Sequence, residues 1–89
     1  MQKELEFRGI PFTQLALYLE ELGGSKVTES MPIIYKDRDW SATILSEEEI
    51  SFTSVFKVNS IKILFKAEDE ETLNEILKKY RKKTFRAGG

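Results

Sequence analysis

Hydrophobic and polar residues alternate at the start of the chain and then adopt a helical spacing. In the stretch ELEFRG, residues 4–9, Leu5 and Phe7 face one way and charged side chains the other, as in a half-buried strand. The spacing that follows places five apolar side chains on one helical stripe: Phe12, Leu15, Ala16, Leu19 and Leu22. Proline suits the first turn of a helix, and glycine suits the residue just after its end. Pro11 and the pair Gly23-Gly24 therefore predict the two ends of a helix.

Residues 31–67 predict four strands connected by polar turns. We place the strands at residues 33–36, 40–45, 50–58 and 61–67, and the turns at 37–39, at the acidic run 47–49 and at Asn59-Ser60. The length of the acidic turn is open, so the register of residues 31–50 is not determined. The last two strands would contribute to the core with Ile50, Phe52, Phe56, Val58, Ile61, Ile63 and Phe65. On this placement, truncating Phe56 or Leu19 to alanine costs about 2–5 kcal/mol each.

A second helix is predicted after the strands. Acidic residues at 68–71 suit the positive end of a helix dipole, and basic residues gather toward the other end. The buried stripe of this helix is Leu73, Ile76, Leu77 and Tyr80.

The element order β-α-β-β-β-β-α predicts an α+β fold in a single domain. Each helix has one apolar stripe to bury, so we expect both helices on one face of an antiparallel sheet. This is the order of the TATA-box-binding-protein-like topology. The alternative is a ferredoxin-like fold, in which two strands merge and residues 83–87, KTFRA, form the last strand. We expect the domain to span residues 1–84 and residues 85–89 to form a flexible C-terminal tail.

The chain contains no cysteine and no histidine. This excludes disulfides, cysteine zinc sites, and catalysis by serine–histidine or cysteine–histidine pairs. The acidic clusters at 20–21, 47–49 and 68–71 lie at helix ends and a turn without a converging partner, so we interpret them as solvated surface. We therefore expect no enzymatic activity, no catalytic or metal-binding residue and no cofactor.

The hydrophobic segments are too short for a membrane protein. No apolar run approaches the ~20 residues of a membrane span, and the first residues, MQKELEF, lack a hydrophobic signal-peptide core. We expect a cytoplasmic protein without a membrane partner.

Charge is distributed unevenly along the chain. Residues 78–89 carry +6 and the preceding 77 residues carry −7, which together give the net charge of −1. The basic residues concerned are Lys78, Lys79, Arg81, Lys82, Lys83 and Arg86. Cations at a helix C-terminus complement the helix dipole without any partner, and the alternative is an anion-binding site for RNA or DNA. Because the rest of the chain is acidic, we do not expect nucleic acid to be the main partner.

If both helices cover one sheet face, the other face is open to partners. A two-residue turn at Asn59-Ser60 would place Lys57 opposite Lys62 and Val55 opposite Leu64. Both pairs lie on the predicted open face, which gives the candidate interface Thr53, Val55, Lys57, Lys62, Leu64 and Lys66. Such a patch is either ordinary exposed surface or an interface, and in the second case we expect a homodimer.

The chain ends with the sequence RKKTFRAGG. A terminal diglycine, here Gly88-Gly89, is the tail that ubiquitin-like modifiers and sulfur carriers present to an activating enzyme. In those carriers the tail leaves the last strand of a β-grasp fold of order ββαββ, whereas here it follows a predicted helix. The order of elements therefore argues against a carrier, although the tail remains a candidate carrier tail.

Two segments carry a resemblance to a known group of proteins. FRGIPFTQLALYLEELGG at residues 7–24 and YRKKTFRAGG at residues 80–89 resemble an uncharacterised small bacterial domain. That domain is similar to the C-terminal domain of proteins related to the small subunit of molybdopterin synthase. The resemblance implies a partner from cofactor biosynthesis. It supplies no active-site residues, and the β-grasp half that would carry sulfur is missing from this chain.

Three functions remain open from the sequence. The first is a non-enzymatic binding or assembly module that self-associates. The second is an accessory of sulfur-carrier or molybdopterin cofactor metabolism that presents the diglycine. The third is a polyanion-binding protein that uses the basic C-terminal segment.

Overall fold

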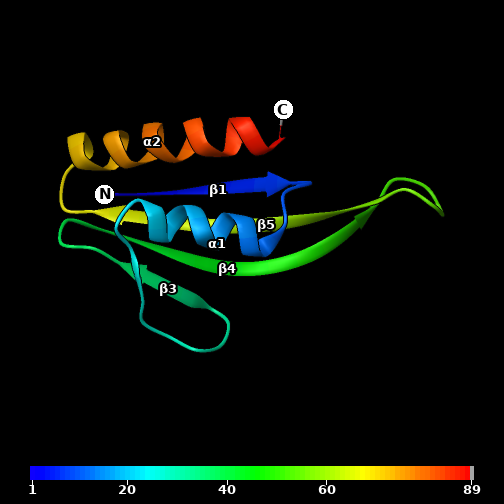
Figure 1. Ribbon diagram of the computed structural model, residues 1–89, viewed down its shortest axis with the longest axis horizontal. Coiled ribbons are helices and arrows are strands. Elements are labelled where there is room, and N and C mark those ends of the chain that lie inside the picture. Colours follow the sequence, from blue (N-terminus) through cyan, green and yellow to red (C-terminus); the bar gives the residue numbers. More distant parts are fainter. Residues whose placement is uncertain (89) are drawn as a thin grey trace.

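Figure 1 shows the computed structural model, which describes residues 1–88 and their side chains through Phe85. Its elements in chain order are β1 Gln2–Arg8, α1 Phe12–Glu21, β2 Ser25–Lys26, β3 Ile33–Lys36, β4 Trp40–Ser51, β5 Lys57–Ala67 and α2 Glu70–Gly88. The strands form one sheet in the order β1-β5-β4-β3-β2, and all neighbouring strands are antiparallel. The predicted α+β class, with one antiparallel sheet and two helices in a single domain, is confirmed. The sequence of element types also agrees, but the strands differ: β2 was not predicted, and the predicted strand 50–58 contains the end of β4, a turn and the start of β5.

Helix α1 begins directly after Pro11, as predicted, and the two glycines end it. The amides of Gly23 and Gly24 donate hydrogen bonds to the carbonyls of Glu20 and Leu19, at 3.0 and 2.9 Å. Gly23 has a φ of +105°, which glycine adopts without strain. Gly24 is buried, and a Cβ at this position would lie 2.9 Å from the Leu19 carbonyl oxygen and 3.1 Å from the Trp40 ring.

Helix α2 begins in the acidic segment predicted for it. The Asp69 carboxylate accepts a 2.7 Å hydrogen bond from the amide of Thr72, and this bond caps the first turn. The same bond lowers the pKa of Asp69 below its ordinary value. The helix continues to Gly88, whereas we had placed the end of the folded domain at residue 84. Residues 83–87 are therefore helical, and the ferredoxin-like alternative with a last strand there is wrong.

One core lies between the sheet and both helices. Its central side chain is Tyr80 of α2, whose ring packs against Phe65 and Phe7 with ring centroids 5.2 and 5.4 Å apart. The Tyr80 hydroxyl donates a 2.8 Å hydrogen bond to the Leu15 carbonyl of α1. The predicted stripes are confirmed, because the buried residues include Leu15, Leu19, Ile61, Ile63, Phe65, Leu73, Ile76, Leu77 and Tyr80.

Strands β4 and β5 are longer than predicted and project beyond the body of the molecule. β3 pairs with β4 only as far as Ile44, and β1 pairs with β5 only as far as Ser60. From Glu49 of β4 and up to Val58 of β5, the two strands pair with each other alone, and we call residues 49–58 the arm (Figure 1). The turns predicted at 47–49 and at Asn59-Ser60 are wrong, because both segments lie inside strands.

A β-bulge lies in β4 at the point where the strand was predicted to end. The register shifts between Ile44 and Ser46, so Leu45 is an extra residue in β4. Before the bulge Ile44 faces the helices, whereas after it Glu47 and Glu49 lie on that side of the sheet. Any alternation drawn through this segment without a bulge assigns each later residue of β4 to the wrong face.

The actual turn lies at the end of the arm. The Thr53 hydroxyl accepts hydrogen bonds from the amides of Val55 and Phe56, at 3.3 and 2.9 Å. The amide of Phe52 donates to the carbonyl of Phe56 at 2.9 Å. The core positions predicted for Phe52 and Phe56 are wrong, because both helices end before the arm and leave it uncovered (Figure 1). The cross-strand pair Ile50 and Val58 was also predicted in the core, but it lies on the sheet face without helices.

Candidate functional site

The residues of the interface predicted from the sequence lie in two separate places in the structure. Lys62, Leu64 and Lys66 lie on the open face of the sheet, in alternation with the buried residues of β5. Thr53 and Val55 lie instead in the turn of the arm. The predicted pairs are wrong: Lys57 pairs with Ser51, Lys62 with Ser46, and Leu64 with Thr43 and Glu4.

The open face forms rows of side chains across the strands. One row contains Glu4, Leu64, Thr43 and Ile34, and the next toward the arm contains Glu6, Lys62 and Ser46. The row after that contains Arg8, Ser60 and Glu48. The face therefore combines half-buried apolar side chains with charges of both signs.

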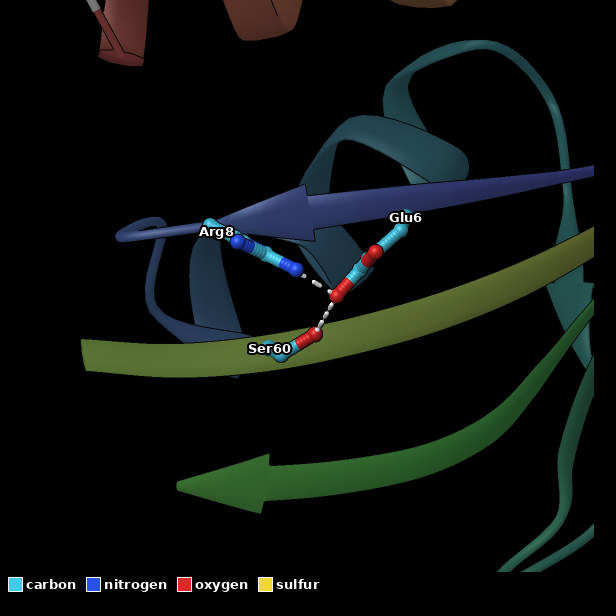
Figure 2. A network of polar contacts seen from close by, with 3 residues as sticks. All are labelled: Glu6, Arg8 and Ser60. Atoms are coloured by element: carbon cyan, nitrogen blue, oxygen red, sulfur yellow. Dashed lines mark hydrogen bonds and ion pairs between the residues drawn. The ribbon is translucent and has the colours of Figure 1, made fainter. Parts of the chain in front are cut away.

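A small polar network lies on this face between β1 and β5 (Figure 2). The Ser60 hydroxyl donates a short hydrogen bond to the Glu6 carboxylate, and Arg8 forms a 3.1 Å ion pair with the same oxygen. The bond from Ser60, followed by the one from Arg8, lowers the pKa of Glu6. The lowered pKa favours the ionised form of Glu6, which places a negative charge beside the positive charge of Arg8.

The arm carries hydrophobic side chains that the core does not use. At its end Phe52, Val55 and Phe56 are 55%, 91% and 57% exposed. The two phenylalanine rings contact each other, with centroids 5.6 Å apart. Alternation from Ile50 and Val58 places both rings on the open side of the sheet, so one side of the arm is a continuous apolar strip. The sequence offered one signal for this exposure, namely the polar residues that surround Phe52 in ISFTS.

The basic residues of α2 divide into paired and unpaired groups. Lys79 forms a 3.1 Å ion pair with Glu75, and Lys83 forms one of 2.9 Å with Glu21. Within the described part of the chain, Lys78, Arg81 and Lys82 have no ion-pair partner. These three and the exposed Phe85 line an open hollow of about 640 Å³. The side chain of Arg86, the remaining predicted anion-binding residue, lies outside the described ones.

The acidic and tyrosine side chains were also compared with what a metal site or an acid–base site requires. Residues 1–88 contain no group of three acidic side chains close enough to hold a metal ion. Burial raises the pKa of the Tyr80 hydroxyl far above its usual range and also raises that of Tyr35. Both tyrosines belong to the core, so these shifts reflect packing. No helix in this part of the chain is long and apolar enough to cross a membrane.

The C-terminal diglycine is only partly described. Gly88 is the last residue of α2, and Gly89 lies outside the described residues. Gly88 therefore belongs to a helix in this fold. In the β-grasp carriers the diglycine belongs to a segment that follows a strand.

Comparison with known protein families matches nearly the whole chain. Residues 3–89 match the family described as "Archaeal MoaD-like protein". The chain belongs to this family. The resemblance to proteins similar to the small subunit of molybdopterin synthase is thereby confirmed. A comparison with curated proteins found no match.

Although the chain belongs to the archaeal MoaD-like family, its fold is not a β-grasp fold. The order β-α-β-β-β-β-α differs from ββαββ, and the arm is a pair of strands that extends past both helices. The exposed arm and the open sheet face are thus the candidate functional surfaces of this archaeal MoaD-like protein.

Proposed function

We propose that this archaeal MoaD-like protein is a non-enzymatic binding and assembly module that serves molybdopterin-related sulfur transfer. The exposed apolar end of the arm is the observation that carries the proposal. Phe52, Val55 and Phe56 contribute little to the core, yet they are held in one defined turn by the Thr53 hydroxyl. Aromatic residues exposed in this way are enriched at the centres of protein interfaces.

The architecture of the arm supports a role in joining protein chains. It lies outside the hydrophobic core, so its side chains are free for a partner without cost to the folded body. Its strands pair with each other and are closed by backbone and side-chain hydrogen bonds, so little order needs to be created on binding. The family match supports the choice of pathway, and the exposed arm supports a binding role.

The second candidate function is that of a sulfur carrier that presents Gly89. The family match favours it, because the matched region extends to the terminal diglycine. On this hypothesis an activating enzyme would form an ATP-dependent adduct with the terminal carboxylate. The helical conformation through Gly88 favours the binding module instead.

The two functions are separated by replacing the gene in its own host. One replacement carries F52S/F56S, and another lacks Gly88 and Gly89. The matched control is L17S/M31S, which removes two exposed hydrophobic side chains outside the arm. Molybdopterin content and protein level are measured in each strain.

We expect F52S/F56S to lower the molybdopterin content several-fold at unchanged protein level, and the control and the deletion to leave it unchanged. Normal content in F52S/F56S would contradict the binding module. Loss of molybdopterin in the deletion strain alone would instead establish the carrier function.

A further inference from the structure

The open face of the sheet is complementary to itself when a second copy is turned end over end. This inference rests on the proposed role of the arm, and it names the partner that the arm and the open face bind. On the open face, β5 presents Val58, Ser60, Lys62, Leu64 and Lys66 in order from the arm to the body, and Phe56 directly precedes this strand. Phe56 and Val58 form the apolar end of this series, and Leu64 lies toward its other end between Lys62 and Lys66.

We propose that two copies stack their open faces about a two-fold axis that crosses the strands between the rows of Ser60 and Lys62. A rotation about such an axis reverses the strand direction and keeps β1 above β1 and β5 above β5. The row of Lys62 then meets the row of Ser60 of the second copy, and the row of Leu64 meets the row of Val58.

This superposition brings unlike charges together on β1. Glu6 shares the row of Lys62, and Arg8 shares the row of Ser60. Glu6 of one copy therefore meets Arg8 of the other, and the contact occurs twice because the axis relates the copies. The network in Figure 2 presents both side chains next to each other on this face.

The same superposition covers the apolar strip of the arm. Leu64, half-buried on the open face, meets Val58 of the arm, and Lys66 meets the exposed ring of Phe56. A lysine over an aromatic ring is a favourable contact. Each arm would thus lie along the body of the other copy.

The competing two-fold axis, parallel to the strands, is electrostatically worse. When it runs along β5, it would place the arms together but would also set Lys62 against Lys62 and Lys66 against Lys66 of the second copy, and like charges that face each other are destabilising. The crossing arrangement avoids this repulsion. Because the arm is only two strands wide, the overlap is small for a permanent dimer, and we expect reversible association with a dissociation constant of micromolar order.

The test is a charge exchange on the Glu6–Arg8 contact, measured by sedimentation with the purified full chain. E6R should repel Arg8 of the second copy, and R8E should repel Glu6, so each variant alone should lose at least tenfold in dimer affinity. Both variants break the same network within the chain, so their mixture isolates the contact between copies. An equimolar mixture should recover the dimer as a heterodimer.

The matched controls are E20R and R38E, which reverse exposed charges away from the open face and should dimerise as the wild type does. A second measurement uses V58D, which should abolish the dimer while circular dichroism shows an unchanged fold. A wild-type monomer at several hundred micromolar overturns the inference. So does a dimer in either single variant as strong as in the wild type, or a mixture that fails to associate.

The sedimentation test of the dimer and the gene replacement in the host can fail independently of each other. A monomeric wild type together with loss of molybdopterin in F52S/F56S would leave the binding module standing with a different partner. Salt-sensitive binding of RNA to a wild type that stays monomeric would support a polyanion site on α2, and the monomeric state would overturn the dimer.

Discussion

At the scale of single residues, Ser60 shows how a misplaced turn hid a specific interaction. Its hydroxyl is buried in β5 and holds the carboxylate of Glu6, whereas Asn59-Ser60 suggested a solvent-exposed hairpin turn. The side chain of Asn59 is similarly engaged and donates a 2.6 Å hydrogen bond to the Ile10 carbonyl. Polar residues in the middle of a strand look like a turn when their partners lie about fifty residues away in the sequence.

The pKa of Glu6 provides a test of this interaction. Its value in the folded protein is lowered, so the stability that ionised Glu6 contributes is fully present above its unfolded pKa and is lost as the pH falls through the folded pKa. We expect S60A to raise the pKa of Glu6 toward its ordinary value, because the first of its two hydrogen-bond donors is gone. Carboxyl NMR titration measures the value, and S54A at the exposed end of the arm is the control. An unchanged titration of Glu6 in S60A would show that the bond is absent in solution.

At the scale of elements, the sequence predicted the helices correctly, because the patterns that indicate a helix lie within one short segment. Both helices and their buried stripes were predicted correctly, since an amphipathic spacing and its end signals lie within one segment. β4 was not, because the bulge at Leu45 changes the face of every later residue and no residue type marks it. The end of α1 is the clearest success, and Gly24 makes it testable.

Substituting Gly24 by alanine should destabilise the fold. A Cβ at this position meets the Leu19 carbonyl oxygen at 2.9 Å, so backbone would have to move, and we expect a cost of about 1–3 kcal/mol. G9A is the informative comparison, because Gly9 has a φ of +78° but no atom within 4 Å of the added Cβ. G9A should lower the free energy of unfolding by about 1 kcal/mol, because only the backbone conformation opposes the new side chain. Urea unfolding of both variants distinguishes steric crowding from strain, and equal losses would rule out the crowding.

At the scale of the whole molecule, the protein has a packed body and an arm that the body does not bury. The sequence predicted the layers and the open face but not the arm, because a hydrophobic residue in a strand is expected to reach a core. Phe52 and Phe56 do not, since no helix extends over them (Figure 1). The candidate site was correspondingly half predicted: Leu64, Lys62 and Lys66 lie on the open face, and the apolar strip of the arm was missed.

This division predicts unequal effects of two alanine substitutions that the sequence alone treats alike. L19A removes a fully buried side chain and should cost about 2–5 kcal/mol. F56A removes a ring that is 57% exposed at the end of the arm and should cost less than about 1 kcal/mol. Chemical denaturation of the two variants at low protein concentration, where no dimer forms, measures both values. A loss of several kcal/mol in F56A would mean that the arm folds back onto the body.

The pairing of the arm also has a consequence for how relatives of this protein can diverge. Beyond Ser60, each residue of one strand is matched only by its neighbour on the other. Residues gained or lost there two at a time, one on each strand, would change the reach of the molecule and leave its interior untouched. Length variation within the lineage should therefore concentrate between Glu49 and Val58 and come in even numbers.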